Sequence, residues 1–326
     1  MKMQGLYKPY IGQYLDFKRS LGYKLRDVEY IFILFDRLTI TRNETEIGIT
    51  KELSDQWCAA RPNESHGTRI LRVSTLSLFA RFLCNLGYPS YVPELLTRRR
   101  SFVPYIFSKD EVMALLSACD QCSLDHVTSD PTRMLMPALF RLLYGTGLRI
   151  GEALALKESD INLCEQYLIV RESKNGTERM VPMSGSLTAV CRQYQARKRS
   201  HLSKSRSTAL FFVKNDHTSY RRNAIYRAFR QVLGEAGIPH RGKSLGPRLH
   251  DLRHTFACHS LAAMAESGID LYHSLPILST YLGHRTLEST DKYVRLTSEM
   301  FPSVLKDVSA VCGYVFPEPQ LTDEEL

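Results

Sequence analysis

Apolar residues in the first ninety positions recur every three to four residues, the spacing that lines them up on one face of an α-helix. Alternation with period two, which marks strands, is absent from this part of the sequence. Gly22 and Gly87 follow two of the runs, where glycine commonly ends a helix. The runs are Tyr10, Tyr14, Phe17 and Leu21; Val28, Ile31, Phe32, Phe35 and Leu38; and Ile70, Val73, Leu76, Ala80 and Leu83. Residues 1–90 are therefore predicted to form a compact bundle of four or five helices.

A segment without periodicity follows this bundle. Residues 91–104 contain prolines and the run Arg98, Arg99 and Arg100. This composition predicts a linker between two domains. A charged linker is usually just solvated, but beside a basic domain its arginines can also follow a row of phosphate groups.

The rest of the chain predicts a second domain, mainly helical, over residues 105–316, and an acidic tail over residues 317–326. Ser108 and Glu111 form a capping box, the sequence signature of a helix start. Apolar spacing then predicts a series of further helices. They cover residues 132–144, 186–199, 219–236, 248–265, 274–282, 287–295 and 298–311.

The second domain also contains a predicted sheet. Two short strand-like runs, 166–171 and 179–183, flank Asn175-Gly176, and Asn-Gly is the strongest short hairpin signal. The apolar residues 210–213 could join this hairpin as a further strand. The predicted fold is therefore mainly α with a small β-sheet, in two domains.

The charge of the chain is strongly basic and unevenly distributed. Lysine and arginine number 43 against 34 acidic residues, for a formal net charge of +9. Residues 97–316 hold 30 of the basic and 20 of the acidic residues. Arginines recur along one predicted helix, at Arg221 and Arg222 and again at Arg227 and Arg230. This pattern predicts an anionic partner, with a solubilising surface as the alternative.

Targeting signals and cysteine chemistry are not prominent in the sequence. No apolar run approaches the ~18 residues of a membrane span, and the N-terminus lacks the apolar core of a signal peptide. The chain is therefore expected to be soluble and cytoplasmic, with no membrane partner. The eight cysteines are scattered, and only Cys119 and Cys122 form a C-x-x-C pair. Helix packing in a reducing compartment and a metal or redox role are the two interpretations of that pair.

Five short stretches of the second domain carry residues suited to chemistry. They are Gly145-Thr-Gly-Leu-Arg149-Ile-Gly-Glu152; Lys174, ahead of Glu178-Arg179-Met-Val-Pro182; His250-Asp-Leu-Arg253-His254-Thr-Phe; Leu282-Gly283-His284; and Tyr293. The glycines before Arg149 fit neither phosphate-loop nor dinucleotide-binding patterns. His250 and His254 have the spacing of a zinc pair, but Arg253 puts a fixed positive charge between them. We therefore predict no metal site and no cofactor.

Together these groups meet the requirements of phosphodiester cleavage without a metal ion. A phenol has a pKa near 10, so only about one in a thousand is ionised at pH 7, and cations and a base must activate it. Two guanidiniums can each bind phosphoryl oxygens in a bidentate manner and neutralise the charge of the transition state. A lysine can protonate the leaving oxygen.

The same stretches resemble the tyrosine recombinase (phage integrase) family, in the family's order and at close to its spacings. The resemblance covers roughly residues 105–311, and the first ninety residues are similar to the family's helical core-binding (SAM-like) domain. It implies a C-terminal α+β catalytic domain and a C-shaped clamp on double-stranded DNA. It also implies a site-specific enzyme that cleaves and rejoins DNA through a 3′-phosphotyrosine intermediate, without metal or ATP, for integration, excision, transposition or resolution.

The resemblance also implies a role for each site residue. Tyr293 would attack the scissile phosphate, and Arg149, Arg253 and His284 would hold it. The remaining roles fall to His250 as acid/base, Lys174 as general acid and Glu152 as the group that orients the site. DNA contacts are expected from the linker arginines and from Arg221 and Arg222.

Assembly and function class follow from the same resemblance. Family members work as tetramers on two synapsed duplexes, so the apolar stripe of the predicted helix 298–311 is expected to dock into a neighbouring copy, unless it packs within its own chain. Two other functions stay open. One is a DNA-binding regulator without catalysis, and the other is a type IB topoisomerase, which shares the chemistry.

Overall fold

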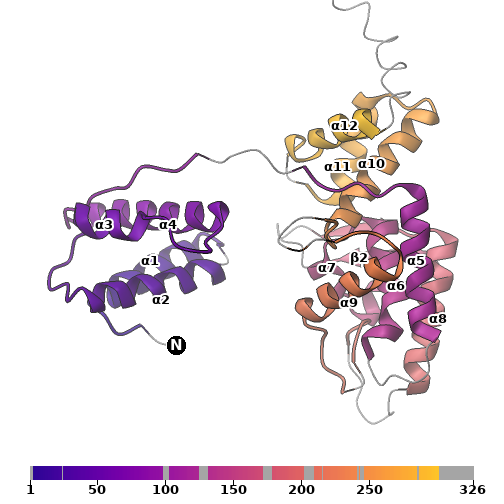
Figure 1. The fold of residues 1–326 in the computed structure, drawn as a ribbon, viewed down its shortest axis with the longest axis horizontal. Helices are drawn as coiled ribbons and strands as arrows, with labels where there is room; N and C mark the ends of the chain where they lie inside the picture. Colours follow the sequence, from indigo (N-terminus) through magenta and orange to yellow (C-terminus); the bar gives the residue numbers. More distant parts are fainter. Residues whose placement is uncertain are drawn as a thin grey trace, which may run out of the picture. The chain divides into compact units, whose positions relative to one another are not determined.

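The computed structural model divides the chain into two compact units, Met1–Phe102 and Val103–Leu326 (Figure 1). The two units have separate apolar cores. The structure describes residues 3–23, 25–97, 103–124, 131–171, 178–201, 209–214, 216–240, 242, 246–284 and 286–300. Among the helices within these ranges, none combines the length and the apolar character that crossing a membrane requires.

The described part of the first unit contains four helices. They are α1 (Lys8–Ser20), α2 (Arg26–Thr41), α3 (Lys51–Cys58) and α4 (His66–Asn85). The side-chain oxygens of Thr50 and Ser65 accept backbone N–H bonds and so cap the starts of α3 and α4. α1 and α4 end just ahead of Gly22 and Gly87, as the sequence predicts.

Aromatic rings fill the core of the first unit. Phe79 is fully buried and meets Tyr14 and Phe32 edge to face, with ring centroids 5.7 and 5.1 Å apart. Phe35 meets Trp57 in the same way at 5.2 Å. Edge-to-face packing of this kind adds to the free energy gained by burying the rings. The core is therefore built by the apolar runs that give the sequence its helical periodicity.

Part of the predicted linker packs on the first unit. The backbone N–H of Tyr91 donates to the carbonyl of Ile49 at 2.7 Å. The Nε2 atom of His66 lies 3.0 Å from the carbonyl oxygen of Thr97. Residues 91–97 therefore make contacts that belong to the first unit.

The second unit is mostly helical. Its described helices are α5 (Lys109–Leu124), α6 (Pro131–Thr146), α7 (Ile150–Ala155), the 3₁₀ turn η1 (Glu158–Asp160), α8 (Gly185–His201), α9 (Arg222–Glu235), α10 (Asp251–Glu266), α11 (Leu271–Leu282) and α12 (Glu288–Met300). The predicted capping box is present ahead of α5. Ser108 Oγ accepts from the N–H of Glu111 at 3.1 Å, and the Glu111 carboxylate accepts from the N–H of Ser108 at 2.8 Å.

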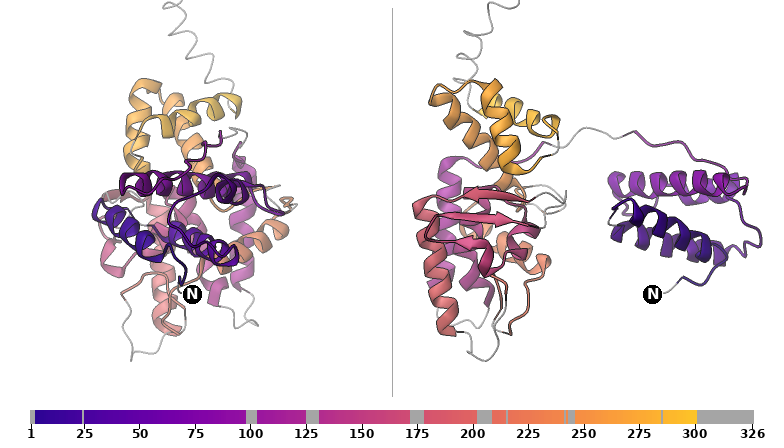
Figure 2. Two further views of the ribbon diagram at one scale, coloured as in Figure 1. Left: turned by 90° about the vertical axis from the view of Figure 1, so that its left-hand side faces the viewer. Right: turned by 180° about the vertical axis from the view of Figure 1, so that it is seen from behind.

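Three antiparallel strands lie side by side in this unit, in the order β1 (Ile161–Asn162), β2 (Tyr167–Val170) and β3 (Arg179–Pro182) (Figure 2). β2 and β3 are the predicted hairpin strands, with Leu168 opposite Val181. The expectation that residues 210–213 add a strand is wrong, because they contribute only an isolated bridge from Leu210 to Lys157. Phe211, Phe212 and Val213 are all buried in succession, so they lack the alternation of a strand with one solvent face.

The end of the described chain also differs from prediction. The sequence predicts a break between helices 287–295 and 298–311, but α12 runs without interruption to Met300. Leu296 and Thr297 lie at the expected break, and both are buried. Leu296 packs with Ala257 of α10, so the core keeps this stretch helical. The remainder of the predicted last helix, residues 301–311, lies outside the described residues.

The C-x-x-C pair lies in the core. Cys119 and Cys122 are both buried, and burial raises the pKa of the Cys119 thiol. The sulfur of Cys122 contacts the carboxylate of Glu235. Within the described residues, no three His, Cys, Asp or Glu side chains gather in a way that could hold a metal ion. These contacts favour the packing interpretation of the pair.

Candidate active site

Arg149 is positioned by the turn between α6 and α7. α6 ends at Thr146, and Gly147 takes a positive φ of 60°. A Cβ atom at Gly147 would lie 2.6 Å from a ring carbon of Phe256 and 2.8 Å from a methyl carbon of Leu282. Only glycine therefore lets this turn approach α10 and α11 so closely. Arg149 is the residue that caps α7, and its side chain is 23% exposed.

Glu152 holds two arginines at once. Its carboxylate accepts from Arg149 Nη1 at 2.7 Å and from the Arg149 backbone N–H at 3.1 Å. It also accepts from Arg179 Nη2 at 2.8 Å, and only 3% of its side chain is exposed. Burial by itself would raise the pKa of Glu152, but the bonds from Arg179 and Arg149 outweigh it and leave the pKa below its usual value. The carboxylate is therefore ionised, which agrees with the predicted orienting role.

Arg179 ties the sheet to the end of α11. It lies on β3 with 8% of its side chain exposed, and its Nε donates to the carbonyl of Tyr281 at 2.9 Å. Its Nη1 would lie 3.0 Å from a Cβ atom at Gly283, which has a positive φ of 66°. Glycine at 283 thus lets the chain turn against the guanidinium just ahead of His284.

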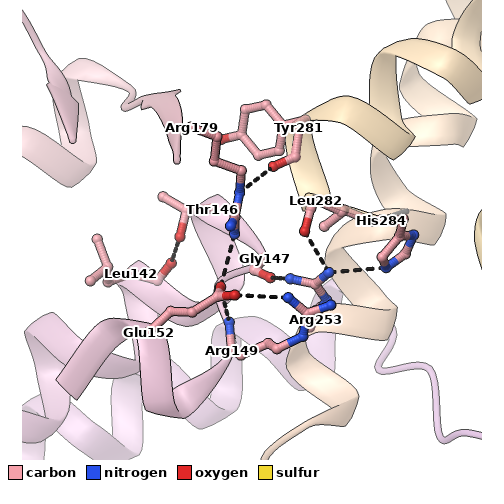
Figure 3. A network of polar contacts seen from close by, with 10 residues as sticks. All are labelled: Leu142, Thr146, Gly147, Arg149, Glu152, Arg179, Arg253, Tyr281, Leu282 and His284. Carbon is pink, nitrogen blue, oxygen red and sulfur yellow. Dashed lines mark hydrogen bonds and ion pairs between the residues drawn. The ribbon is translucent and has the colours of Figure 1, made fainter. Parts of the chain in front are cut away.

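Arg253 joins three separate stretches of the chain (Figure 3). Its Nη1 donates to the carbonyl of Gly147 at 2.6 Å, and its Nη2 donates to the carbonyl of Leu282 at 2.8 Å. Nη2 also lies 3.0 Å from Nε2 of His284. Burial, together with the nearby charge of Arg149, lowers the pKa of Arg253 to about 10, so the group stays charged at pH 7. The buried guanidinium therefore fixes the relative positions of the turn before α7 and the end of α11.

His284 is held from both sides. Arg253 can only donate, so Nε2 of His284 is the acceptor of that bond. The other nitrogen, Nδ1, then carries the proton and donates to Thr290 Oγ1 at 2.8 Å. Burial and the charge of Arg253 lower the pKa of His284 to about 4, so the ring is neutral at pH 7. A neutral ring with a fixed tautomer lies beside the buried guanidinium.

Tyr293 lies on α12 with 1% of its surface exposed. Its hydroxyl is 2.9 Å from Nδ1 of His254, and its ring stacks on that of His284 with centroids 6.2 Å apart. The ammonium of Lys292 lies 5.0 Å from the ring centroid. Burial raises the pKa of Tyr293 to about 12, although the charges of Arg253 and Arg149 act in the opposite direction. The phenol therefore carries its proton at pH 7.

The two histidines at the start of α10 differ in burial. His250 immediately precedes the helix and is exposed, whereas His254 is 5% exposed. Their rings meet edge to face with centroids 4.8 Å apart. Partial burial and the charge of Arg253 lower the pKa of His250 to about 4. The structure thus places His250 at the surface of the site, with His254 between it and the tyrosine.

A basic hollow of about 920 Å³ adjoins the site. Its lining includes the exposed arginines Arg221, Arg227 and Arg230 of the α9 region, as well as His250. Arg222 lies outside this lining, against the backbone of α7, where its Nη2 would be 2.6 Å from a Cβ atom at Gly151. Arg221 and Arg222, two of the five arginines predicted to contact DNA, therefore lie beside His250 and α7 respectively.

Four predicted site residues have no described position. They are Lys174, Arg98, Arg99 and Arg100, which lie outside the described residues. The six other predicted catalytic residues come together from separate elements. They are Arg149, Glu152, His250, Arg253, His284 and Tyr293.

Sequence reasoning assigned no role to Arg179 and considered His254 only as a metal ligand. A signal for Arg179 was available. It shares the inward face of β3 with the buried Val181, while Met180 between them is 61% exposed. A charged residue on the buried face of a strand requires an ionic partner, here Glu152. For His254 the sequence offers only its spacing from His250.

Acidification is expected to destabilise the second unit through His254. Burial lowers the pKa of His254 to about 2, and the nearby His250 and Lys292 act in the same direction. The unfolded chain, with a histidine pKa near 6.5, then takes up the proton first as the pH falls, so the stabilisation is complete above pH ~6.5 and is lost below it. Between pH 7 and pH 5 the loss from this residue is about 2 kcal/mol.

Urea unfolding of the full chain at pH 7 and pH 5 measures this loss. The variant His254→Asn removes the titrating group and should show a smaller difference between the two pH values. Equal pH dependence in the two proteins would contradict the assignment to His254.

Comparisons with known proteins all indicate the same protein family. Residues 106–300 match the phage integrase family. A putative integrase/recombinase of Sinorhizobium fredii, y4rB, is 32% identical over 300 residues, which cover 91% of this chain and 95% of that protein. The tyrosine recombinase XerD of Listeria innocua is 27% identical over 294 residues, which cover 89% and 90% of the two chains.

Solved structures share the fold. The Tn1549 transposon integrase, in complex with circular intermediate DNA, has a TM-score of 0.62 at 16% identity and covers 87% of this chain and 94% of that one. A lambda integrase dimer bound to a core site has a TM-score of 0.59 at 18% identity, with the same coverage. The fold, the match over residues 106–300 and the similarity to y4rB agree. The chain belongs to the phage integrase family, the tyrosine recombinases that break and rejoin DNA strands in site-specific recombination.

Proposed function

We propose that Tyr293 is the nucleophile of this recombinase. One convergence supports the assignment. Arg253 bonds both His284 and the carbonyl of Gly147, two residues ahead of Arg149, and the ring of Tyr293 stacks on His284. Three regions that are far apart in the sequence, around residues 147–149, 253 and 284–293, therefore meet around one point, where a phosphodiester would face two guanidiniums and a phenol.

The chemistry at this point is a transesterification. The phenolic oxygen bonds to phosphorus, the 5′-oxygen leaves with a proton, and a 3′-phosphotyrosine and a free 5′-hydroxyl result. Arg149, Arg253 and His284 hold the non-bridging oxygens and offset the charge that develops on them. Strand exchange reverses the step with a new 5′-hydroxyl. Because one ester replaces another, the bond energy is conserved.

Three further residues support this step. Glu152 fixes Arg149 through the bonds described above, so it acts as a positioning residue. His250 is exposed at the surface of the site and serves as an acid/base group there. Lys174 would protonate the leaving oxygen. It belongs to the segment that joins β2 to β3, and Arg179 at the start of β3 is held by Glu152.

The DNA-bound enzyme is a tetramer on two synapsed duplexes in the cytoplasm, with docking through residues 298–311. The exposed Arg221 and Arg222 and the linker arginines 98–100 would contact DNA phosphates. The basic hollow beside His250 is suited to bind the phosphate backbone of DNA at this edge of the site. The Tn1549 transposon integrase, which shares the fold, was solved in complex with circular intermediate DNA, which agrees with this partner.

A trapping experiment tests the proposal. Duplexes that the full chain selects from a random pool are nicked a few nucleotides to the 3′ side of the cleaved phosphate, so that the short fragment carrying the new 5′-hydroxyl diffuses away after attack. Incubation in EDTA should then accumulate a covalent complex, and mass spectrometry should find the nucleotide on Tyr293. Binding without any covalent complex would instead indicate a non-catalytic regulator. Relaxation of supercoiled plasmid without sequence preference would indicate a topoisomerase.

A further inference from the structure

His254 makes a direct contact with the proposed nucleophile. Its Nδ1 lies 2.9 Å from the hydroxyl of Tyr293, and both side chains are almost completely buried. The exposed His250 is the other acid/base group of the site, but its ring contacts that of His254, at 4.8 Å between centroids. The imidazole that lies within hydrogen-bond distance of the phenolic hydroxyl is that of His254.

Both partners of this hydrogen bond are neutral at pH 7. Burial raises the pKa of Tyr293 to about 12, so the phenol keeps its proton, and burial lowers the pKa of His254, so the imidazole carries no charge. The phenolic hydroxyl can therefore donate to Nδ1 of His254, 2.9 Å away. A neutral imidazole with its proton on Nε2 offers a lone pair at that atom. The arrangement thus has the geometry of a base poised to accept the phenolic proton.

We propose that His254 is the general base that accepts the proton of Tyr293 during DNA cleavage. This inference rests on the proposed function of Tyr293. As the bond from the phenolic oxygen to phosphorus forms, the proton moves to Nδ1, and the bond from phosphorus to the 5′-oxygen breaks. The 5′-oxygen takes its proton from a separate acid. In rejoining, the His254 imidazolium returns its proton to the departing phenolate.

The charges around His254 explain why the transfer depends on DNA. Arg253, His250 and the nearby Arg248 face it from α10 and its start, and Lys292 faces it from α12. These groups disfavour an imidazolium in the free enzyme. A bound phosphodiester brings a negative charge next to Arg253, which reduces that repulsion. The base therefore gains strength only when its substrate is in place.

The pair Tyr144 and His259 provides a matched control. Its Nδ1-to-hydroxyl distance is also 2.9 Å, and His259 lies on the same helix as His254. The residues of this second pair take no part in the proposed chemistry. Substitutions at His259 therefore reproduce the loss of a tyrosine–histidine contact from α10 without touching the site.

Single-turnover cleavage of the nicked duplex by the full chain tests the proposal. An asparagine side chain can place an oxygen near the position of Nδ1 and keep the bond to Tyr293, but it cannot accept a proton. His254→Asn and His254→Ala should both lower the rates of cleavage and rejoining by about 10²- to 10⁴-fold. Affinity for DNA should change only a few-fold, and His259→Asn should cleave within about 3-fold of the unsubstituted chain.

Two further cleavage experiments test whether the variants fail to activate the nucleophile or fail to protonate the leaving group. A substrate with a 5′-bridging sulfur has a leaving group that needs no proton. This substrate should therefore not restore the cleavage rate of His254→Asn. Free imidazole should partly restore His254→Ala. Near-normal cleavage by His254→Asn would show that the contact only positions the tyrosine, and faster cleavage would show that it restrains the tyrosine. Either result, or full rescue by the sulfur substrate, would overturn the proposal.

A measurement on the unsubstituted chain guards against misfolded variants. Nitrogen NMR of labelled histidine should find His254 with its proton on Nε2 and Nδ1 as an acceptor, and a proton on Nδ1 would overturn the proposal. Absence of any covalent complex with the unsubstituted chain would instead refute the proposed function itself. The two failures are therefore distinguishable.

Discussion

Replacing Tyr293 with phenylalanine is expected to abolish covalent attachment to DNA. The substitution removes one oxygen and leaves the ring, which stacks on His284 and packs in the cluster that contains Cys258 and Leu296. Loss of a nucleophile commonly costs several orders of magnitude, so single-turnover cleavage should fall by at least about 10⁴-fold. Denaturing gels of end-labelled nicked duplex give the measurement, because the covalent complex migrates more slowly than free DNA.

Tyr144→Phe is the matched control for this experiment, since it also removes a partly buried hydroxyl that contacts a histidine of α10. It should leave cleavage within about 3-fold of the unsubstituted chain, because oxyanion binding and attack do not involve this hydroxyl. Residual attachment by Tyr293→Phe at more than a tenth of the normal rate would show that another residue attacks phosphorus.

Replacing Glu152 with alanine is expected to destabilise the second unit by about 3–5 kcal/mol. The carboxylate is the ionic partner of Arg179, which is buried on β3, and it also binds Arg149. Its removal leaves a buried guanidinium without a compensating charge. Cleavage should fall as well, because Arg149 loses the bonds that hold it at the start of α7. Urea unfolding of the full chain at pH 7 measures the stability.

Asp120→Ala is the control for the stability measurement. Asp120 pairs with Arg141 at 2.6 Å, but about half of its side chain is exposed, so its loss should cost no more than about 1 kcal/mol. Glu152→Gln keeps the shape of the side chain and one acceptor. Its free energy of unfolding should therefore lie between those of Glu152→Ala and the unsubstituted chain. A cost below about 1 kcal/mol for Glu152→Ala would contradict the role assigned to the buried pair.

The charge balance of the site favours an anionic ligand. Among the described residues, Arg149, Arg179 and Arg253 converge there, and Glu152 is the carboxylate partner of Arg149 and Arg179. Arg253 uses its donors on two carbonyls and a neutral histidine, so none of these partners offsets its charge. Burial lowers its pKa to about 10, which reflects this cost. A phosphodiester would supply the missing negative charge, so part of the binding free energy comes from relief of repulsion among the cations.

Local signals determined much of the fold. The glycines after α1 and α4, the capping box at Ser108 and the hairpin signal at Asn175-Gly176 each act within a few residues of the chain. The sequence can reveal such features because their energetics depend on neighbouring residues alone. The sequence also predicted Arg149, Arg253, His284 and Tyr293 as site residues, but only as an ordered set of motifs.

Long-range contacts decided the rest. β1 and not residues 210–213 completes the sheet, and α12 continues through Leu296, because buried side chains find partners on elements far away in the sequence. The bond between His254 and Tyr293 spans 39 positions, and the bond between Arg179 and Glu152 spans 27. Periodicity and spacing carry no information on such pairs. They are fixed only when packing excludes water, so that each buried polar group must find its partners within the protein.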